Sequence, residues 1–283
     1  MANEVHPADE VHRASDVLAD FTSRDFEALG KRRTVFEIGD GPAVIVITEM
    51  PGITPAVADF ARRVAAIGCT AVMPHLFGDP WRAPTTGSNR PDVGAFMRSI
   101  VPACISREFH VLATGTTSPV VDWLRELARD AHGRCGGPGV GAVGMCFTGG
   151  FALAMATDDR LLAPVLSQPS LPFGITKGRR GSIDISPDDL ATVRERCGAG
   201  LEVIGLRFEG DKLVPPERFE FLRRELGEAF VAIELPDDSA NPEAPNPPHS
   251  VLTEHLVDEP GEPTRAALDR VLELFRSRLL TTA

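Results

Sequence analysis

The sequence contains no tyrosine and only two tryptophans among its 283 residues. Without a phenol, no site in this chain can use tyrosine as a proton donor or as an oxyanion-binding group. Cysteine is scarce, and no Cys-x-x-Cys pair occurs among Cys69, Cys104, Cys135, Cys146 and Cys197. This pattern predicts neither a zinc ribbon nor a thioredoxin-type redox centre, and it is typical of a reducing, cytoplasmic compartment.

Positive charge and long apolar runs are lacking as well. The formal net charge is -11 at pH 7, which argues against nucleic acid as a partner, since such proteins present a basic face. No apolar run approaches the roughly 20 residues of a membrane helix, and residues 1–20 have no apolar core of a signal peptide. We therefore expect a cytoplasmic protein with neither a nucleic-acid nor a membrane partner.

Short apolar segments alternate with amphipathic ones along most of the chain. The apolar segments predict strands at residues 34–38, 43–48, 69–73, 139–143, 161–167, 202–208 and 230–235. The amphipathic segments predict helices at residues 54–68, 118–131, 187–197, 216–226 and 263–280. Such alternation is typical of an α/β fold whose mostly parallel central sheet has helices on both faces. The sequence thus predicts a single domain over residues 32–283, preceded by a peripheral N-terminal extension over residues 1–31.

Three irregular stretches separate some of these elements, at residues 79–91, 168–187 and 236–248. Open α/β folds bind their ligands at the carboxyl edge of the sheet, where the loops that follow the strands gather. We expect the three stretches to lie at that edge and to surround a site.

The segment Gly144-Met145-Cys146-Phe147-Thr148-Gly149-Gly150 has the pattern of a nucleophile elbow. It follows the apolar residues 140–143 and leads into small residues typical of a helix. Glycine and small neighbours are needed because the central residue of this turn has a strained backbone with other backbone packed closely around it. The central residue here is Cys146, so the pattern predicts a thiol nucleophile.

A thiol nucleophile needs a base and an acid that orients the base. Elbow hydrolases carry them in the chain order nucleophile, acid, histidine, and Asp211 and His249 follow Cys146 in that order. Taken alone, Asp211 is better explained as a turn aspartate that serves only its own loop, and His255 is a rival for His249. Together with the elbow, the ordered trio predicts a Cys146–His249–Asp211 triad.

Several segments resemble the dienelactone hydrolase (carboxymethylenebutenolidase) family over roughly residues 34–280. They are the cysteine elbow, Glu49-Met50-Pro51-Gly52 after the first apolar strand, Met73-Pro74 followed by Leu76-Phe77, and the turn Gly210-Asp211-Lys212-Leu213-Val214-Pro215. The resemblance implies an α/β-hydrolase fold that works without a cofactor. It also implies a Cys-His-Asp triad, matched here by Cys146, His249 and Asp211.

The resemblance assigns further roles by position. The backbone N–H groups of Phe147 and Met50 are expected to form the oxyanion hole. Glu49 is expected to contact the cysteine and control its ionisation. A purely structural alternative for Glu49 is a partly buried carboxylate that binds N–H groups at the nearby helix start.

Two positions depart from the family pattern. Thr148 stands where the family has glycine two residues after the cysteine, which is expected to reshape the elbow slightly without destroying it. The run His249-Ser250-Val251-Leu252-Thr253 contains no arginine, although bidentate binding of a substrate carboxylate is a task for arginine. Dienelactone itself is therefore not the predicted substrate, unless a cation comes from Arg82, Arg90 or Arg98.

Aromatic side chains are candidates for the substrate pocket, because small-molecule sites are mostly apolar. The candidates are Phe77, Trp81, Phe147 and Phe173, with core packing as the alternative for each. His75 and His110 have no partners at metal-ligand spacing, so no metal site is predicted.

The sequence therefore predicts a hydrolase that cleaves a small activated ester, lactone or thioester through an acyl-enzyme thioester. The expected partner is this small-molecule substrate, and a homo-oligomer remains open. Three alternatives also remain. They are an acyltransferase on the same fold, a non-catalytic binding or regulatory protein, and a redox-sensing thiol at Cys146.

Overall fold

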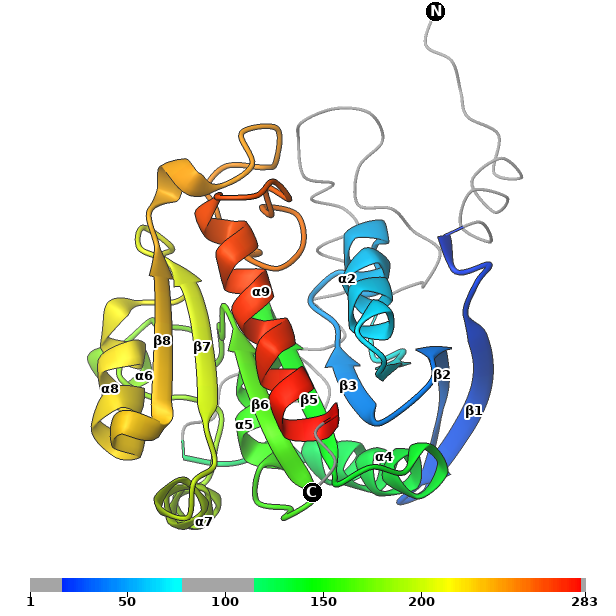
Figure 1. Cartoon of the computed structure of the whole chain (residues 1–283). Helices are drawn as coiled ribbons and strands as arrows, with labels where there is room; N and C mark the ends of the chain where they lie inside the picture. The colour runs from blue at the N-terminus through cyan, green and yellow to red at the C-terminus, as the bar shows by residue number, and fades with distance from the viewer. Residues whose placement is uncertain (1–16, 78–114, 281–283) are drawn as a thin grey trace, which may run out of the picture.

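The computed structural model describes residues 17–77 and 115–280. Its centre is an eight-stranded sheet with the order β1-β2-β4-β3-β5-β6-β7-β8 (Figure 1). The strands are β1 (Thr22–Ala28), β2 (Lys31–Gly39), β3 (Ala43–Ile47), β4 (Thr70–Pro74), β5 (Val140–Met145), β6 (Leu161–Ser167), β7 (Val203–Phe208) and β8 (Phe230–Leu235).

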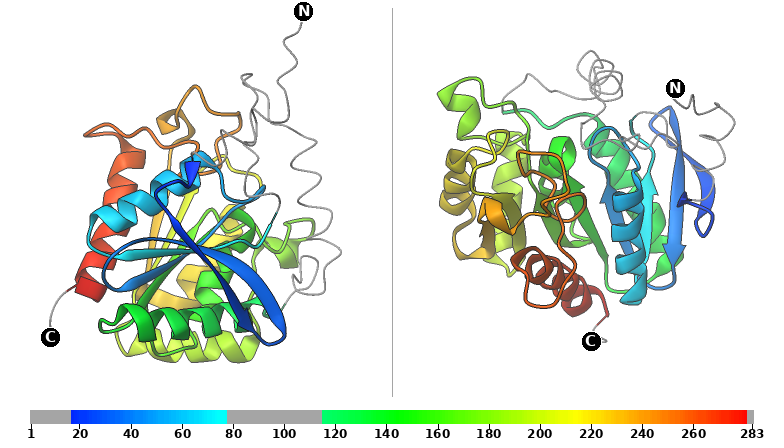
Figure 2. Two further views of the ribbon diagram at one scale, coloured as in Figure 1. Left: turned by 90° about the vertical axis from the view of Figure 1, so that its right-hand side faces the viewer. Right: turned by 90° about the horizontal axis from the view of Figure 1, so that it is seen from above.

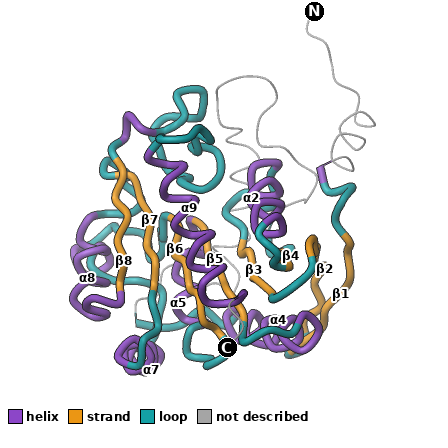
Figure 3. The backbone as a smooth tube through the Cα atoms, viewed as in Figure 1, coloured by secondary structure: helices purple, strands orange, loops and turns teal. Residues whose placement is uncertain are grey.

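Most of the sheet is parallel. The six consecutive strands β4, β3, β5, β6, β7 and β8 pair in parallel with one another, while β2 pairs antiparallel with both β1 and β4. Parallel strands end at the same edge, so the loops that follow β3, β5, β6, β7 and β8 gather there. Figure 3 shows the longest of these described loops, which follows β8, beyond the ends of β7 and β8.

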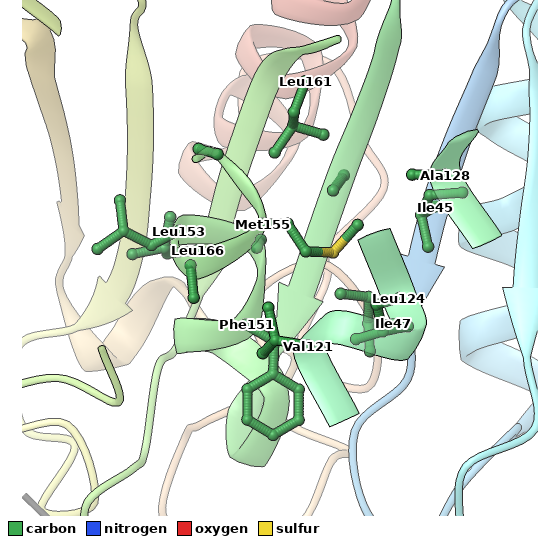
Figure 4. Packing of buried hydrophobic residues seen from close by; sticks show 14 of the residues in the cluster. Ile45, Ile47, Val121, Leu124, Ala128, Phe151, Leu153, Met155, Leu161 and Leu166 are labelled. Atoms are coloured by element: carbon green, nitrogen blue, oxygen red, sulfur yellow. The ribbon is translucent and has the colours of Figure 1, made fainter. Parts of the chain in front are cut away.

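Helices cover both faces of the sheet. They are α2 (Pro55–Ala66), α4 (Val120–Cys135), α5 (Gly149–Met155), α6 (Lys177–Arg180), α7 (Pro187–Gly198), α8 (Pro216–Leu226) and α9 (Pro263–Phe275). Helices α2 and α9 share one hydrophobic cluster, and α4, α5, α7 and α8 share the other. The views in Figure 2 show the sheet between these layers, and Figure 4 shows α4 and α5 packing on β3 and β6. The predicted mostly parallel α/β architecture is confirmed.

The helix starts follow local chemistry that can be read in the sequence. Thr54 and Ser186 each cap a helix by accepting a hydrogen bond from a backbone N–H three residues on, at 3.3 and 3.1 Å. Each is followed by proline at the first helical position, whose fixed φ suits a helix start. The last helix continues past Phe275 as a π-helical turn, Arg276–Leu280.

The N-terminal region differs from expectation, because residues 22–28 of the predicted extension form strand β1 within the sheet. Its composition is polar because β1 is an edge strand with one half-buried face. Phe26 on that face packs edge-on against Trp123 of α4, with ring centroids 5.3 Å apart. Arg24 bonds Glu37 of β2 at 3.0 Å. The domain boundary predicted after residue 31 falls within the β1–β2 hairpin.

The elbow helix α5 depends on a close approach of two backbones. Its first residue, Gly149, lies against the loop that follows β6, and a Cβ added there would stand 2.5 Å from Cα of Pro169. Gly133 within α4 is a contrasting helical glycine, because a Cβ there would meet nothing within 4 Å.

We expect Gly149→Ala to lower the free energy of unfolding by about 1–3 kcal/mol, since the added methyl group must displace Pro169. Gly133→Ala should raise it by about 0.5–1 kcal/mol through helix propensity. Urea denaturation of both variants measures these changes. Equal effects at the two positions would contradict the close packing inferred at Gly149.

Candidate active site

Cys146 lies at the sharp turn between β5 and α5, as the first residue of a short 3-10 helix, Cys146–Thr148. Its φ of 53° is in the left-handed region that non-glycine residues rarely adopt. The turn leaves no room at Gly144, where a Cβ would stand 2.1 Å from the carbonyl oxygen of Thr148. The predicted strained turn is therefore present, with the thiol at its tip and half-buried.

Thr148 is compatible with this turn, and its side chain also connects the turn to the neighbouring strand β3. The side chain is fully buried, and its Oγ1 accepts a hydrogen bond from the Met145 N–H at 2.9 Å. The same hydroxyl lies 2.8 Å from the carbonyl oxygen of Ile47, the last residue of β3, to which it donates. The threonine that departs from the family pattern thus ties the elbow to β3.

Asp211 and His249 come together as the chain order suggested. Nδ1 of His249 lies 2.6 Å from Oδ2 of Asp211, and the aspartate is buried. The other carboxylate oxygen of Asp211 accepts the Leu213 N–H at 2.9 Å. Asp211 therefore serves its own turn and holds His249 at the same time, so the two explanations of this residue are compatible.

The electrostatics of His249 depend on Cys146 as well as on Asp211. Burial disfavours the charged imidazolium, but the nearby Cys146 and the hydrogen bond to Asp211 outweigh burial and raise the pKa of His249 well above its ordinary value. Nε2 of His249 is buried and has no hydrogen-bond partner within the described residues. This nitrogen is thus available for proton exchange with a reacting group beside Cys146.

His255, the rival histidine, supports the loop that carries His249. Its Nε2 donates to the Pro245 carbonyl at 2.6 Å, and its Nδ1 accepts the Ser250 N–H at 3.1 Å. This pattern requires the neutral ring with the proton on Nε2. Burial is the main cause that lowers the pKa of His255, which favours the same neutral form.

Glu49 is buried two residues beyond the end of β3, and hydroxyl groups surround its carboxylate. Ser250 donates to Oε2 at 2.6 Å, Thr253 donates to Oε1 through a very short hydrogen bond, and Nε2 of Gln168 donates to Oε2 at 3.2 Å. None of the hydrogen bonds of Glu49 goes to Cys146. The carboxylate instead joins the loop after β3 to the loops after β6 and β8.

Two residues at the site are not among those predicted from the sequence, Gln168 and Ser170 in the loop after β6. Gln168 is fully buried with a φ of 37°. The N–H of Ser170 donates to the Cys146 carbonyl at 2.9 Å, and its Oγ lies 3.5 Å from the Cys146 sulfur. The sequence could have indicated these two residues only by their position, since they follow a predicted strand in an irregular stretch expected at the carboxyl edge of the sheet.

The predicted oxyanion residues follow the ends of two adjacent strands, β3 and β5. Met50 is buried at the end of β3, and buried Phe147 follows Cys146. Phe77 packs edge-on against Phe147, with ring centroids 5.5 Å apart, so this pocket candidate is next to the elbow. Phe173 is half-buried in the loop after β6. The remaining candidates lie outside the described residues: Trp81, Arg82, Arg90, Arg98 and His110.

Asp184 is a buried acid behind the elbow helix. A Cβ added at Gly150 of α5 would stand 3.2 Å from Cβ of Asp184. Ser118 donates to Oδ2 of Asp184 at 2.7 Å, while Oδ1 has no hydrogen-bond partner in the part of the chain that the structure describes. Burial raises the pKa of Asp184 to about 7.

Within residues 17–77 and 115–280, no three His, Cys, Asp or Glu side chains are grouped as a metal site would require. The helices in these ranges are all too short or too polar to cross a membrane.

Comparison with known proteins gives one family and many similar folds. The sequence model described as "Dienelactone hydrolase family" matches residues 33–171. No curated protein sequence matches the chain significantly. Similarity to solved structures is extensive, at low sequence identity, and it supports the α/β-hydrolase fold.

Three of the solved structures are instructive. A putative dienelactone hydrolase from Klebsiella pneumoniae is 17% identical, with a TM-score of 0.58, over 90% of this chain and 97% of its own. A dienelactone hydrolase from Anabaena variabilis is 15% identical, with a TM-score of 0.54, over 92% and 98%. A dienelactone hydrolase-like promiscuous phosphotriesterase from metagenomic libraries is 16% identical, with a TM-score of 0.55, over 92% and 99%. Each likeness covers nearly the whole of both chains.

Because the pKa of Asp184 is raised, replacing this acid by a neutral residue should stabilise the protein, and the gain in stability should grow with pH. Between the ordinary pKa of 3.8 and the folded value of about 7, the folded state retains a proton that the unfolded state releases. The free-energy cost of burying the charged Asp184 carboxylate therefore grows as the pH rises between these two pKa values, and it no longer changes above the higher one. We expect Asp184→Asn to be more stable than wild type at pH 8 by up to about 4 kcal/mol, with the gap closing near pH 4.

Denaturation at several pH values measures this gap. Asp188→Asn, at an exposed position in the first turn of α7, is the control. Its stability relative to wild type should not increase with pH. A pH-independent difference between Asp184→Asn and wild type would contradict the prediction.

Proposed function

Since the chain belongs to the dienelactone hydrolase family and is a hydrolase, we propose that it cleaves a small activated ester, lactone or thioester with Cys146 as the nucleophile. The observation that carries this proposal is the 2.6 Å hydrogen bond between His249 Nδ1 and Asp211 Oδ2. It fixes the ring so that Nε2 is the nitrogen left for chemistry, and Cys146 is close enough to raise the pKa of that ring. A nucleophile, a base and an orienting acid are the parts that acyl transfer requires.

The proposed reaction proceeds in two halves. The Cys146 thiolate adds to the substrate carbonyl, and the tetrahedral intermediate collapses as the leaving group takes a proton from His249 Nε2. The product of this half is a thioester between the acyl group and Cys146. In the second half His249 takes a proton from water, the resulting hydroxide adds to the thioester, and the thiolate leaves as the carboxylic acid forms.

The developing oxyanion needs hydrogen-bond donors placed in advance. We assign this role to the backbone N–H groups of Met50 and Phe147. They belong to two different strand ends, so their spacing depends on the contact between the end of β3 and the elbow. The 2.8 Å hydrogen bond from Thr148 to the Ile47 carbonyl supports that contact directly.

The substrate class follows from the leaving group and from the loop after His249. The Cys146 thiolate is itself a good leaving group, so the first tetrahedral intermediate goes forward only when the substrate's own leaving group departs as readily. Activated esters, lactones and thioesters meet this condition better than amides. Ser250 and Thr253 occupy the loop after His249 and bind Glu49. They offer no cation for a substrate carboxylate, and dienelactone is therefore not the substrate that we propose.

We expect Cys146→Ala and His249→Ala each to lower kcat/KM toward activated esters, lactones or thioesters by at least about 10³-fold. Asp211→Asn should cause a loss of about 10²–10⁴-fold, because the ring loses its orienting partner. Steady-state rates across a small substrate panel, with product analysis in the presence of alcohol and thiol acceptors, measure hydrolysis and acyl transfer separately.

Cys135→Ala is the matched control, because this half-buried cysteine ends α4 and takes no part in the site. Mass spectrometry of the enzyme mixed with substrate should detect an acyl group on Cys146. Activity that survives Cys146→Ala, or a folded wild type with no turnover on the panel, would refute the nucleophilic role.

We further propose that Glu49 limits ionisation of Cys146, since a buried carboxylate disfavours a second negative charge nearby. In the resting arrangement three donors hold that carboxylate, from Ser250, Thr253 and Gln168. Glu49→Gln should therefore shift formation of the Cys146 thiolate to lower pH. The pH dependence of thiolate absorbance, with Cys146→Ala as the baseline, gives this shift, and Glu37→Gln on β2 is the remote control. An unchanged thiol titration would remove this role.

A further inference from the structure

The segment that follows β6 is docked onto the nucleophile elbow by its backbone. Ser170 is buried, and its N–H donates to the Cys146 carbonyl at 2.9 Å. Pro169 approaches so closely that only glycine fits opposite it, at Gly149. The N–H of Gln168 donates to the Leu206 carbonyl of β7 at 2.7 Å. The position of Ser170 is thus fixed relative to both the elbow and the sheet.

Arg218, on α8, fixes the same segment from its other side. The side chain is fully buried, and it donates to the carbonyls of Pro169 at 2.6 Å and Pro172 at 2.5 Å, which flank Ser170 in the chain. It also donates to the Ser182 carbonyl at 2.7 Å. Burial lowers the pKa of Arg218 only to about 10, so the guanidinium stays charged at neutral pH. A buried cation with carbonyl partners is a costly arrangement, and here it holds one short loop in place.

The hydroxyl of Ser170 has two acceptors and one proton to donate. Its Oγ lies 3.0 Å from the carbonyl oxygen of Gln168 and 3.5 Å from the sulfur of Cys146. A neutral thiol or a thioester sulfur is a weak acceptor, so the carbonyl is preferred in those states. A thiolate carries a full charge, and hydrogen bonds to charged groups are roughly twice as strong as neutral ones.

We propose that Ser170 is a further catalytic residue, whose hydroxyl donates a hydrogen bond to the Cys146 thiolate and returns to the Gln168 carbonyl when the sulfur is acylated. The inference rests on the proposed role of Cys146 as the nucleophile. The hydrogen bond stabilises the thiolate before attack and again when the thiolate leaves the second tetrahedral intermediate. No proton leaves Ser170 in either step, so the hydroxyl rotates between its acceptors without ionising.

The test is the pH dependence of thiolate formation in Ser170→Ala, read from thiolate absorbance and from the rate of alkylation by iodoacetamide. We expect about three- to tenfold less thiolate than in wild type at pH values below the titration midpoint. Each variant is compared with its own Cys146→Ala counterpart, which removes the contribution of the other cysteines. Ser182→Ala is the matched control, because this hydroxyl, in the next loop after α6, donates to the Arg179 carbonyl at 3.1 Å and not to sulfur. The control should titrate as wild type does.

Two more variants keep the test decisive. Ser170→Gly also lacks the hydroxyl and should show the same shift as Ser170→Ala, while Ser170→Thr keeps the hydroxyl and should restore the wild-type titration. A folded Ser170→Ala or Ser170→Gly protein with an unshifted titration would overturn the proposal. An equal shift in Ser182→Ala would also overturn it, because the cause would then be a loosened loop.

The thiol titration needs no substrate. Failure of the proposed hydrolase function would appear as turnover that survives Cys146→Ala. Failure of the role of Ser170 would appear in the titration alone.

Discussion

The parallel pairing of β3, β5, β6, β7 and β8 is the constraint on which the site depends. These five strands are consecutive in the sheet, and each ends at the same edge. The loop after β3 carries Glu49 and Met50, β5 leads into Cys146, and the loops after β6, β7 and β8 carry Ser170, Asp211 and His249. Residues separated by up to two hundred positions in the chain meet because the sheet orders their strands. Any change that shifts one strand against its neighbour would displace one of these groups from the others.

Buried polar side chains fix these loops relative to one another, since backbone pairing ends where the strands end. Glu49 receives hydrogen bonds from the loops after β6 and β8, Arg218 holds the loop after β6 to α8, and Thr148 joins the elbow to β3. Burial makes each of these groups expensive to leave unpaired, so the loops are constrained to the arrangement that satisfies them. The neutral His255 does the same for the loop that carries His249. Rigidity at this edge is thus obtained from polar contacts, and the two hydrophobic clusters support the sheet beneath it.

The sequence was sufficient to predict the parallel sheet, most helices and the meeting of Asp211 with His249, because each leaves a local signal. Hydrophobic period marks strands and helices, the Thr54-Pro55 pair marks a helix start, and chain order marks the acid and the histidine. Strand β1 escaped prediction because an edge strand with one half-buried face has an almost entirely polar sequence. Ser170 and Gln168 escaped because nothing local distinguishes a serine that faces a thiol from one in an ordinary loop. The partners of Glu49 lie in loops that are 119 to 204 residues away in the chain, and no rule of local spacing predicts such pairs.

The groups around the proposed nucleophile, Cys146, are expected to have opposite effects on the ionisation of its thiol. In the proposed mechanism the Glu49 carboxylate disfavours a thiolate, whereas a hydrogen bond from Ser170 and a positive charge on His249 favour one. Ser250, Thr253 and Gln168 occupy the Glu49 carboxylate with donors. A carboxylate that already accepts three hydrogen bonds is a poor base toward the thiol, and His249 is therefore the group that we propose as the proton acceptor of Cys146. Two of these three donors stand in the loop after His249, where a carboxylate-binding arginine is lacking. The hydroxyls in this loop thus offer no cation to an anionic substrate, and they bind the carboxylate of the protein's own Glu49 instead.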